Sequence, residues 1–152
     1  MSAFSKLLSP EAVLTGLNVS NAKQALEHLS AFAAGQTGLS ANTIFEMLQQ
    51  RERLGSTGVG EGFAIPHCKL KGLERLYGVL ALLEKPIDYN ALDSEPVDIL
   101  FLLLAPEDSG PDHLKALARI ARVFRQPGFL SKIRTVRDPA ALYIMLMEED
   151  KS

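Results

Sequence analysis

Hydrophobic side chains in the first third of the chain recur at the spacing of an amphipathic helix. Residues 20–34 follow this pattern, which predicts a helix that Ser20 caps and Gly35 ends. A second helix is predicted over residues 40–53, with Ser40 at its start. Both predicted helices carry one apolar face, so we expect them to pack against a common core.

The middle of the chain contains apolar runs that are too short for helices. Residues 76–83 and 97–105 are almost continuously apolar, which is typical of central strands covered by helices on both faces. Residues 12–17 form a weaker strand candidate, and the short apolar run 63–65 is expected to end at Pro66-His67. The pattern therefore predicts a sheet assembled from distant parts of the sequence.

The last third of the chain again has helical patterning. The Ser-Gly-Pro-Asp run at 109–112 is a helix start, and the following helix is expected to turn Leu114 and Phe124 inward. A short helix is predicted at 129–136, and Asp138 caps the last one. We therefore predict an α/β fold, with helices outside and a mixed sheet inside.

Composition narrows the class of protein. The chain has 152 residues, 47% of them hydrophobic, and a net charge of −2, which fits one folded domain (1–152, core about 8–148) and excludes extensive disorder. The 16 basic and 18 acidic residues suggest no nucleic-acid surface, and the single Cys68 excludes a disulfide framework. No signal peptide and no membrane span are expected, so the predicted location is cytoplasmic.

Four glycines make the segment 55–62 the most informative loop. Successive amides in such a loop can bind an anion, and we expect Ser56, Thr57 and Gly58 to bind phosphate oxygens there. The segment has no P-loop lysine, and Phe63 stands where a dinucleotide fingerprint needs its third glycine. A simple turn with several positive-φ positions is the structural alternative.

His67 follows this loop within a few residues. A neutral imidazole has one nitrogen lone pair free near pH 7 and can act as a nucleophile. A phosphoryl group on that ring would need nearby donors, which the glycine-rich loop could provide. On its own, a single histidine at a strand end is more often structural.

The run Arg-Glu-Arg-Leu-Gly-Ser-Thr-Gly-Val-Gly-Glu-Gly-Phe-Ala-Ile-Pro-His at 51–67 resembles the active-site segment of a known family. It is similar to the IIA domains of the fructose–mannitol superfamily of the phosphotransferase system, most of all to the nitrogen-regulatory branch. The resemblance extends from Leu8 to the Asp-Pro-Ala-Ala-Leu run at 138–142. It implies the mannitol-type IIA fold, a mixed sheet with helices on both faces, and no metal or other cofactor.

The resemblance also implies roles for three residues. His67 matches the histidine that accepts a phosphoryl group from an HPr-like phosphohistidine carrier, called NPr in the nitrogen-regulatory branch. Arg51 and His113 match the family's active-site arginine and second histidine. Cys68 departs from the glycine common there, and we expect a small buried residue. A metal site of His67, Cys68 and His113 lacks a ligand-spacing motif.

The resemblance points to partners as well. Proteins that regulate potassium transport or nitrogen use are expected targets, and Glu61, Glu107 and Asp108 are candidate acidic edges of the carrier's docking surface. One alternative is a separate IIA subunit that passes phosphate to the IIB domain of a fructose or mannitol transporter. Another is an anion-binding module without transfer. The sequence leaves the oligomeric state open, a homodimer included.

Overall fold

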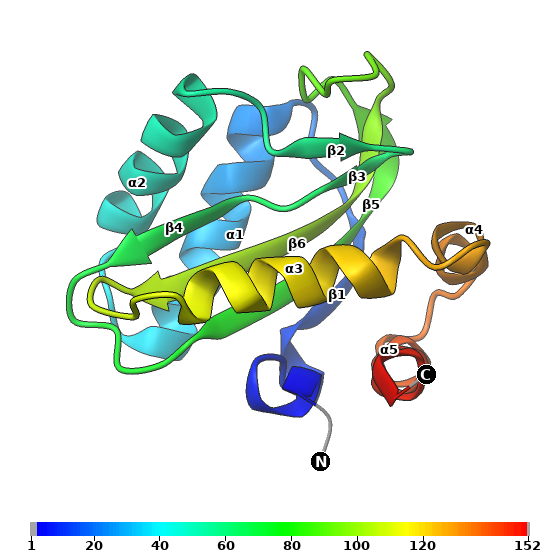
Figure 1. The fold of residues 1–152 in the computed structure, drawn as a ribbon. Coiled ribbons are helices and arrows are strands. Elements are labelled where there is room, and N and C mark those ends of the chain that lie inside the picture. Colours follow the sequence, from blue (N-terminus) through cyan, green and yellow to red (C-terminus); the bar gives the residue numbers. More distant parts are fainter. Residues whose placement is uncertain (1–2, 152) are drawn as a thin grey trace.

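One mixed sheet with helices on both faces forms the molecule, as the computed structural model of residues 3–151 shows (Figure 1). The strand order is β1-β5-β6-β3-β2, and β4 also pairs with β6. The strands are β1 (Val13–Leu17), β2 (Gly58–Gly60), β3 (Phe63–Ala64), β4 (His67–Leu70), β5 (Tyr77–Ile87) and β6 (Val97–Pro106).

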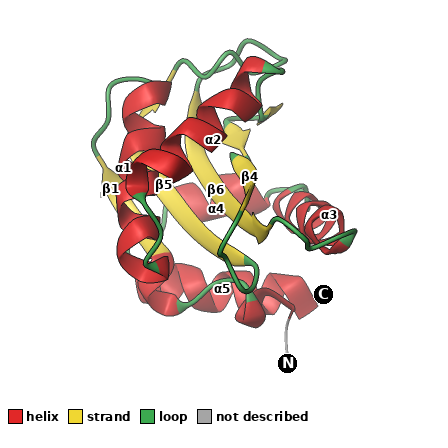
Figure 2. Ribbon diagram, turned by 90° about the vertical axis from the view of Figure 1, so that its left-hand side faces the viewer, coloured by secondary structure: helices red, strands yellow, loops and turns green. Residues whose placement is uncertain are grey.

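Helices α1 (Ala22–Thr37) and α2 (Ala41–Arg53) cover one face of the sheet. Figure 2 shows α3 (Asp112–Phe124) on the opposite side, where α4 (Phe129–Arg134) follows it; α5 (Pro139–Lys151) packs near β1. Two short 3-10 helices, η1 (Ala3–Lys6) and η2 (Pro10–Ala12), precede β1. No helix within residues 3–151 is long and apolar enough to cross a membrane.

The antiparallel pair of β5 and β6 forms the centre of the sheet. Leu80 lies opposite Phe101, and both side chains are fully buried. Their apolar runs therefore do what the sequence predicted: they form strands covered on both faces. Strand β5 continues four residues beyond the predicted end at 83, to Ile87, because its last residues still pair with the start of β6.

Strand β6 also organises the chain around His67. It pairs in parallel with β3, where Phe63 lies beside Ile99, and with β4, where His67 lies beside Leu103. As expected, the short apolar strand stops before Pro66-His67, because β3 ends at Ala64; His67 then opens a further strand, β4, which the sequence did not predict. The Leu103 amide donates to the carbonyl of Pro66 at 2.9 Å, so the chain stays hydrogen-bonded to β6 between β3 and β4.

The ends of α1 differ from the predicted ends. Asn21 rather than Ser20 accepts a hydrogen bond from a first-turn amide, so the helix starts later. It runs through Gly35 and stops at Gly38, whose φ of 79° is the left-handed conformation that closes helices. The start of α2 after Ser40 is as predicted, with the Ser40 side chain capping it.

Helix α3 is anchored through its C-terminal half. Ile120, Val123 and Phe124 are buried, and the Phe124 ring stacks on Phe63 with centroids 4.4 Å apart. Leu114, in the first turn, was expected to point inward but is 60% exposed. The apolar side chain of Leu114 therefore lies at the surface, beside the site described next.

Candidate functional site

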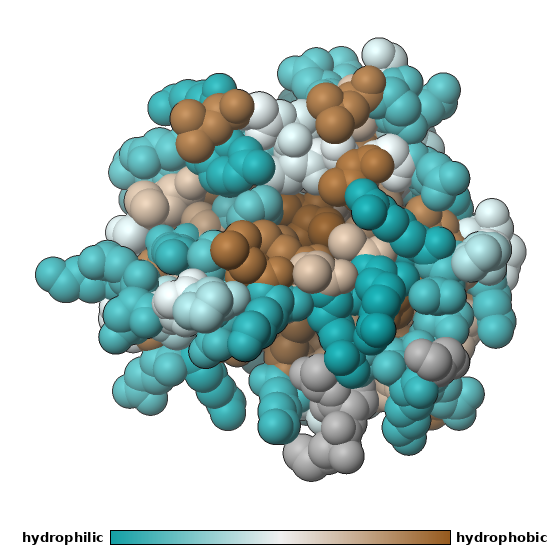
Figure 3. Space-filling model, viewed as in Figure 1, coloured by the Kyte–Doolittle hydropathy of each residue, from teal (hydrophilic) through white to brown (hydrophobic). Residues whose placement is uncertain are grey.

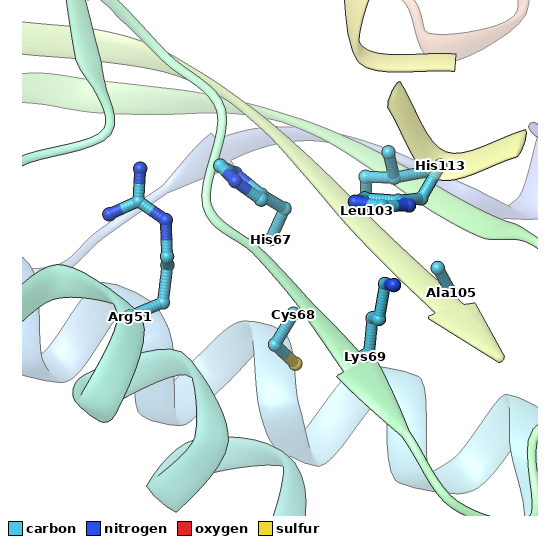
Figure 4. A pocket seen from close by; sticks show the side chains of 7 residues that line it. All are labelled: Arg51, His67, Cys68, Lys69, Leu103, Ala105 and His113. Atoms are coloured by element: carbon cyan, nitrogen blue, oxygen red, sulfur yellow. The ribbon is translucent and has the colours of Figure 1, made fainter. Parts of the chain in front are cut away.

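Strand β4 presents two basic side chains on one of its sides. Successive side chains on a strand alternate, so His67 and Lys69 point the same way and Cys68 points toward the helices (Figure 4). Lys69 is not among the site residues predicted from the sequence. The two-residue period counted from His67 was the signal that could have found it.

A cavity of about 250 Å³ lies over this strand, at the junction of three further elements. Arg51 reaches it from the last turn of α2, and His113 reaches it from the first turn of α3. Residues of β6 complete the lining, which consists of Arg51, His67, Cys68, Lys69, Leu103, Ala105 and His113 (Figure 4). The fold thus brings together the three residues singled out in the sequence, and no carboxylate belongs to this lining.

The ring of His67 is held in one tautomer. Its Nδ1 lies 2.6 Å from the carbonyl oxygen of Ile65, and a carbonyl can only accept, so Nδ1 carries the proton. The lone pair is therefore on Nε2. Burial lowers the pKa of His67, and the charges of Arg51 and His113 lower it further, against the raising effects of the Ile65 carbonyl and of Glu52. A neutral, nucleophilic imidazole results.

The two flanking side chains, Arg51 and His113, are also held by backbone carbonyls. Arg51 donates from Nη1 to the carbonyl of Gly55 at 2.8 Å, which ties the end of α2 to the start of the glycine-rich loop. His113 donates from Nδ1 to the carbonyl of Gly110 at 2.9 Å, which leaves its Nε2 available to a ligand. These carbonyls orient both groups and leave further N–H donors of Arg51 unused.

The predicted phosphate-binding residues Ser56, Thr57 and Gly58 lie outside the cavity lining. The Ser56 hydroxyl donates to the carbonyl of Tyr89 and accepts from the Gly58 amide. Thr57 is 4% exposed, and both its amide and its hydroxyl donate to the carboxylate of Glu52. Their donors are engaged within the protein, because the loop folds against its neighbours instead of opening toward His67.

Cys68 is half-buried and free of any disulfide. Burial raises the pKa of its thiol to about 12, so the thiol stays protonated and is a poor nucleophile and a poor metal ligand. Within residues 3–151, no group of three or more His, Cys, Asp or Glu side chains is placed to hold a metal ion. The chemistry of the cavity therefore depends on its imidazoles and its fixed cations.

Comparison with known proteins places this arrangement in a family. The model of the family described as "Phosphoenolpyruvate-dependent sugar phosphotransferase system, EIIA 2" matches residues 6–149. The chain belongs to this EIIA 2 family. Its membership confirms the resemblance stated from residues 51–67.

Relatives within the EIIA 2 family narrow the branch. The chain is 53% identical to the "Nitrogen regulatory protein" of Bradyrhizobium diazoefficiens over 140 residues, which is 92% of each chain. It is 39% identical to the protein of the same name from Klebsiella oxytoca, over 95% of this chain and 90% of the relative. The protein is thus a IIA component of the nitrogen-regulatory type.

Solved structures agree with the fold. The crystal structure of nitrogen regulatory protein IIA-Ntr from Neisseria meningitidis superimposes with a TM-score of 0.90 at 30% identity, over 95% of this chain and 99% of that chain. The mannitol IIA of Escherichia coli gives a TM-score of 0.76 at 12% identity, over 91% of this chain and 98% of that one, which is a likeness of fold. The predicted mannitol-type α/β fold is therefore confirmed.

Proposed function

We propose that this chain is a phosphocarrier whose His67 accepts a phosphoryl group from an HPr-like phosphohistidine protein, NPr. The observation that carries the proposal is the hydrogen bond from His67 Nδ1 to the Ile65 carbonyl, at 2.6 Å. It leaves the Nε2 lone pair free beside a cavity that has cations and no carboxylate in its lining. A nucleophile next to fixed positive charge suits attack on a phosphoryl group.

The transfer needs no co-reactant beyond the donor protein. The lone pair of His67 Nε2 forms a new P–N bond while the P–N bond to the donor histidine breaks, and that electron pair returns to the donor ring. The Nδ1 proton stays on His67. As the His67 ring gains positive charge, its hydrogen bond to the Ile65 carbonyl becomes charge-assisted and stronger.

The remaining lining residues fit binding of the phosphoryl oxygens. Arg51 and Lys69 supply permanent positive charge, and His113 supplies a further N–H donor when its Nε2 is protonated. Phosphoryl transfer depends mainly on positioning and charge stabilisation, and preorganised donors in a partly closed cavity do both. Lys69 takes the place that the sequence had assigned to Ser56 and Thr57.

The donor protein would dock over the cavity mouth. Leu54 directly follows α2 and is 84% exposed, and Leu114 directly follows His113 and is 60% exposed, so an exposed leucine lies close in the chain to Arg51 and another to His113. Figure 3 shows hydrophobic side chains gathered on this face among hydrophilic ones. Glu61, Glu107 and Asp108 are exposed and remain the candidate acidic edges. Apolar surface beside a reactive group is typical of a transient protein interface.

Phosphorylation would also change what this face can bind. A phosphoryl group adds up to about two negative charges to a cavity whose fixed charges are now positive. Regulators of potassium transport or of nitrogen use are the targets we propose; the names of the relatives refer to nitrogen regulation. Their binding would then differ between the two forms of His67.

The test is intact-mass analysis after mixing the protein with phosphoenolpyruvate, the general phosphotransferase enzyme and its HPr-like carrier. We expect one acid-labile phosphoryl group on the wild type and none on His67→Ala. The matched control is His28→Ala, because His28 is exposed on α1 and outside the cavity. It should be labelled like the wild type.

Other outcomes would decide against the proposal. A stoichiometric label on His67→Ala would remove His67 as the acceptor. No label on the wild type with competent carriers would favour a module that binds anions without transfer. Rapid passage of the label to a sugar-specific IIB domain would indicate a transporter subunit instead.

A further inference from the structure

Glu52 holds an unusual place for a carboxylate. It lies half-buried in the last turn of α2, where the helix dipole disfavours negative charge. Neither of the two salt bridges within residues 3–151 involves it. Three neutral donors surround it instead: the Thr57 amide at 3.0 Å, the Thr57 hydroxyl at 2.5 Å and the Tyr89 hydroxyl at 3.1 Å. The carboxylate therefore binds the loop rather than a cation.

A continuous chain of hydrogen bonds runs from Glu52 to the ring of His67. Glu52 fixes both donors of Thr57, and the Thr57 carbonyl accepts from the amide of Ile65 at 3.1 Å. The carbonyl of the same Ile65 residue accepts from His67 Nδ1 at 2.6 Å. The Ile65 carbonyl sets the tautomer of His67, and its orientation thus depends on where Glu52 holds Thr57.

Tyr89 closes this network from the other side. It comes from the connection between β5 and β6, is 4% exposed, and its hydroxyl lies within 3.3 Å of the Thr57 hydroxyl as well as near Glu52. Burial and the charge of Glu52 raise its pKa, so the hydroxyl keeps its proton and donates. The Ser56 hydroxyl also donates to the Tyr89 carbonyl at 2.8 Å. Ser56 is therefore hydrogen-bonded to Tyr89 directly, and Thr57 is linked to it through the shared carboxylate of Glu52.

We propose that Glu52, acting with Thr57 and Tyr89, is a positioning residue that keeps the proton on His67 Nδ1 and the nucleophilic lone pair on Nε2. This inference rests on the proposed phosphocarrier function and names the part of the protein that prepares its nucleophile. Glu52 acts through Thr57 and Ile65 and does not line the cavity. Three donors converge on this carboxylate, and its negative charge makes the hydrogen bonds charge-assisted and therefore stronger than bonds between neutral groups.

The decisive variant is Glu52→Gln, which has the same shape. An amide keeps one acceptor oxygen and turns an NH₂ group toward donors that need an acceptor. The readout is the ¹⁵N spectrum of the His67 ring in unphosphorylated protein. We expect the wild type to show the Nδ1–H tautomer and Glu52→Gln to show a mixture of both tautomers. Phosphoryl transfer should slow by about tenfold, the effect of losing a bond of ordinary strength.

Two further variants complete the design. Glu46→Gln changes an exposed carboxylate of the same helix and should leave both the ring spectrum and the transfer rate unchanged. Tyr89→Phe removes one of the three donors and leaves the charge of Glu52 in place. It should shift the His67 ring signals in the same direction as Glu52→Gln, but less.

The outcomes separate this proposal from the proposed function. If Glu52→Gln keeps the wild-type tautomer and transfer rate, Glu52 has no positioning role, although transfer itself stands. If Glu52→Gln does not fold, an unchanged ring spectrum in Tyr89→Phe overturns the proposal. If the variants shift the tautomer but no form of the protein is ever phosphorylated, the positioning network stands and the phosphocarrier function fails.

Discussion

Replacing Gly58 with alanine tests why a glycine stands at this point of the loop. The backbone of Gly58 lies outside the left-handed region, so its conformation alone does not require glycine. A Cβ built there would lie 2.7 Å from the Cβ of Ala91 and 3.0 Å from its Cα. The glycine is therefore needed because β2 packs tightly against the connection between β5 and β6.

The size of the effect follows from these distances. Carbon atoms that touch prefer separations of about 3.5–4.0 Å, so Gly58→Ala forces a shift of about 1 Å. Ala91 has no flexible side-chain end that could move away, and it is 7% exposed. Overpacking of this kind lowers the free energy of unfolding by about 1–3 kcal/mol. Alanine also reduces the conformational entropy of the unfolded chain, which raises the free energy of unfolding by about 0.5 kcal/mol. We expect a net loss of about 0.5–2.5 kcal/mol in the free energy of unfolding.

Urea unfolding followed by circular dichroism measures this loss. With a slope of about 2 kcal/mol/M, the midpoint should fall by about 0.2–1.2 M. Ala91→Gly in the Gly58→Ala background should recover part of the loss, because it removes the methyl group that the new Cβ meets but leaves the nearby backbone in place. Gly35→Ala is the control: this exposed helical glycine has open space around it and should stabilise the protein by about 0.5–1 kcal/mol. An unchanged midpoint for Gly58→Ala would refute the packing argument.

Three further predictions concern the titration of His67, the reactivity of Cys68 and the ion pair of the buried Asp150. Burial, with the charges of Arg51 and His113, lowers the pKa of His67 below 6.5, so as the pH drops the unfolded chain binds this proton before the folded protein does, and the free energy of unfolding falls. Between about pH 7.5 and about pH 5.5 the wild type should therefore lose more stability than His67→Gln. Equal losses would contradict the lowered pKa. Cys68, with its pKa raised to about 12 by burial, should react with iodoacetamide at least about tenfold more slowly in native protein than in urea, and equal rates would show an exposed thiol. Asp150→Asn should lower the free energy of unfolding in urea by about 1–3 kcal/mol, because the fully buried carboxylate pairs with Arg119 at 2.7 Å and so joins α5 to α3. A loss within the error of the measurement would contradict this.

Local patterns determined most of the elements. Two kinds of local signal predicted their elements from the sequence: the continuous apolar runs of β5 and β6, and the helix-capping residue Ser40. Each signal depends only on residues that are close together in the chain. The errors arose where a distant partner decides. His67 opens a strand because the amide of Leu103, far along the chain, holds the preceding carbonyl. Leu114 is exposed because α3 packs through its other half.

The candidate site divides in the same way. The sequence by itself picked out His67 and Arg51 as candidate site residues, because the motif at 51–67 keeps residue types at fixed spacing, and the family resemblance added His113 outside that motif. Only the tertiary structure decided which donors face the cavity. The hydroxyls of Ser56 and Thr57 are used by Tyr89 and Glu52, whereas Lys69 shares the side of β4 with His67. The sequence specifies which hydrogen-bond donors and acceptors a segment carries. Each donor hydrogen forms one strong hydrogen bond, and the tertiary structure determines which acceptor lies within its reach.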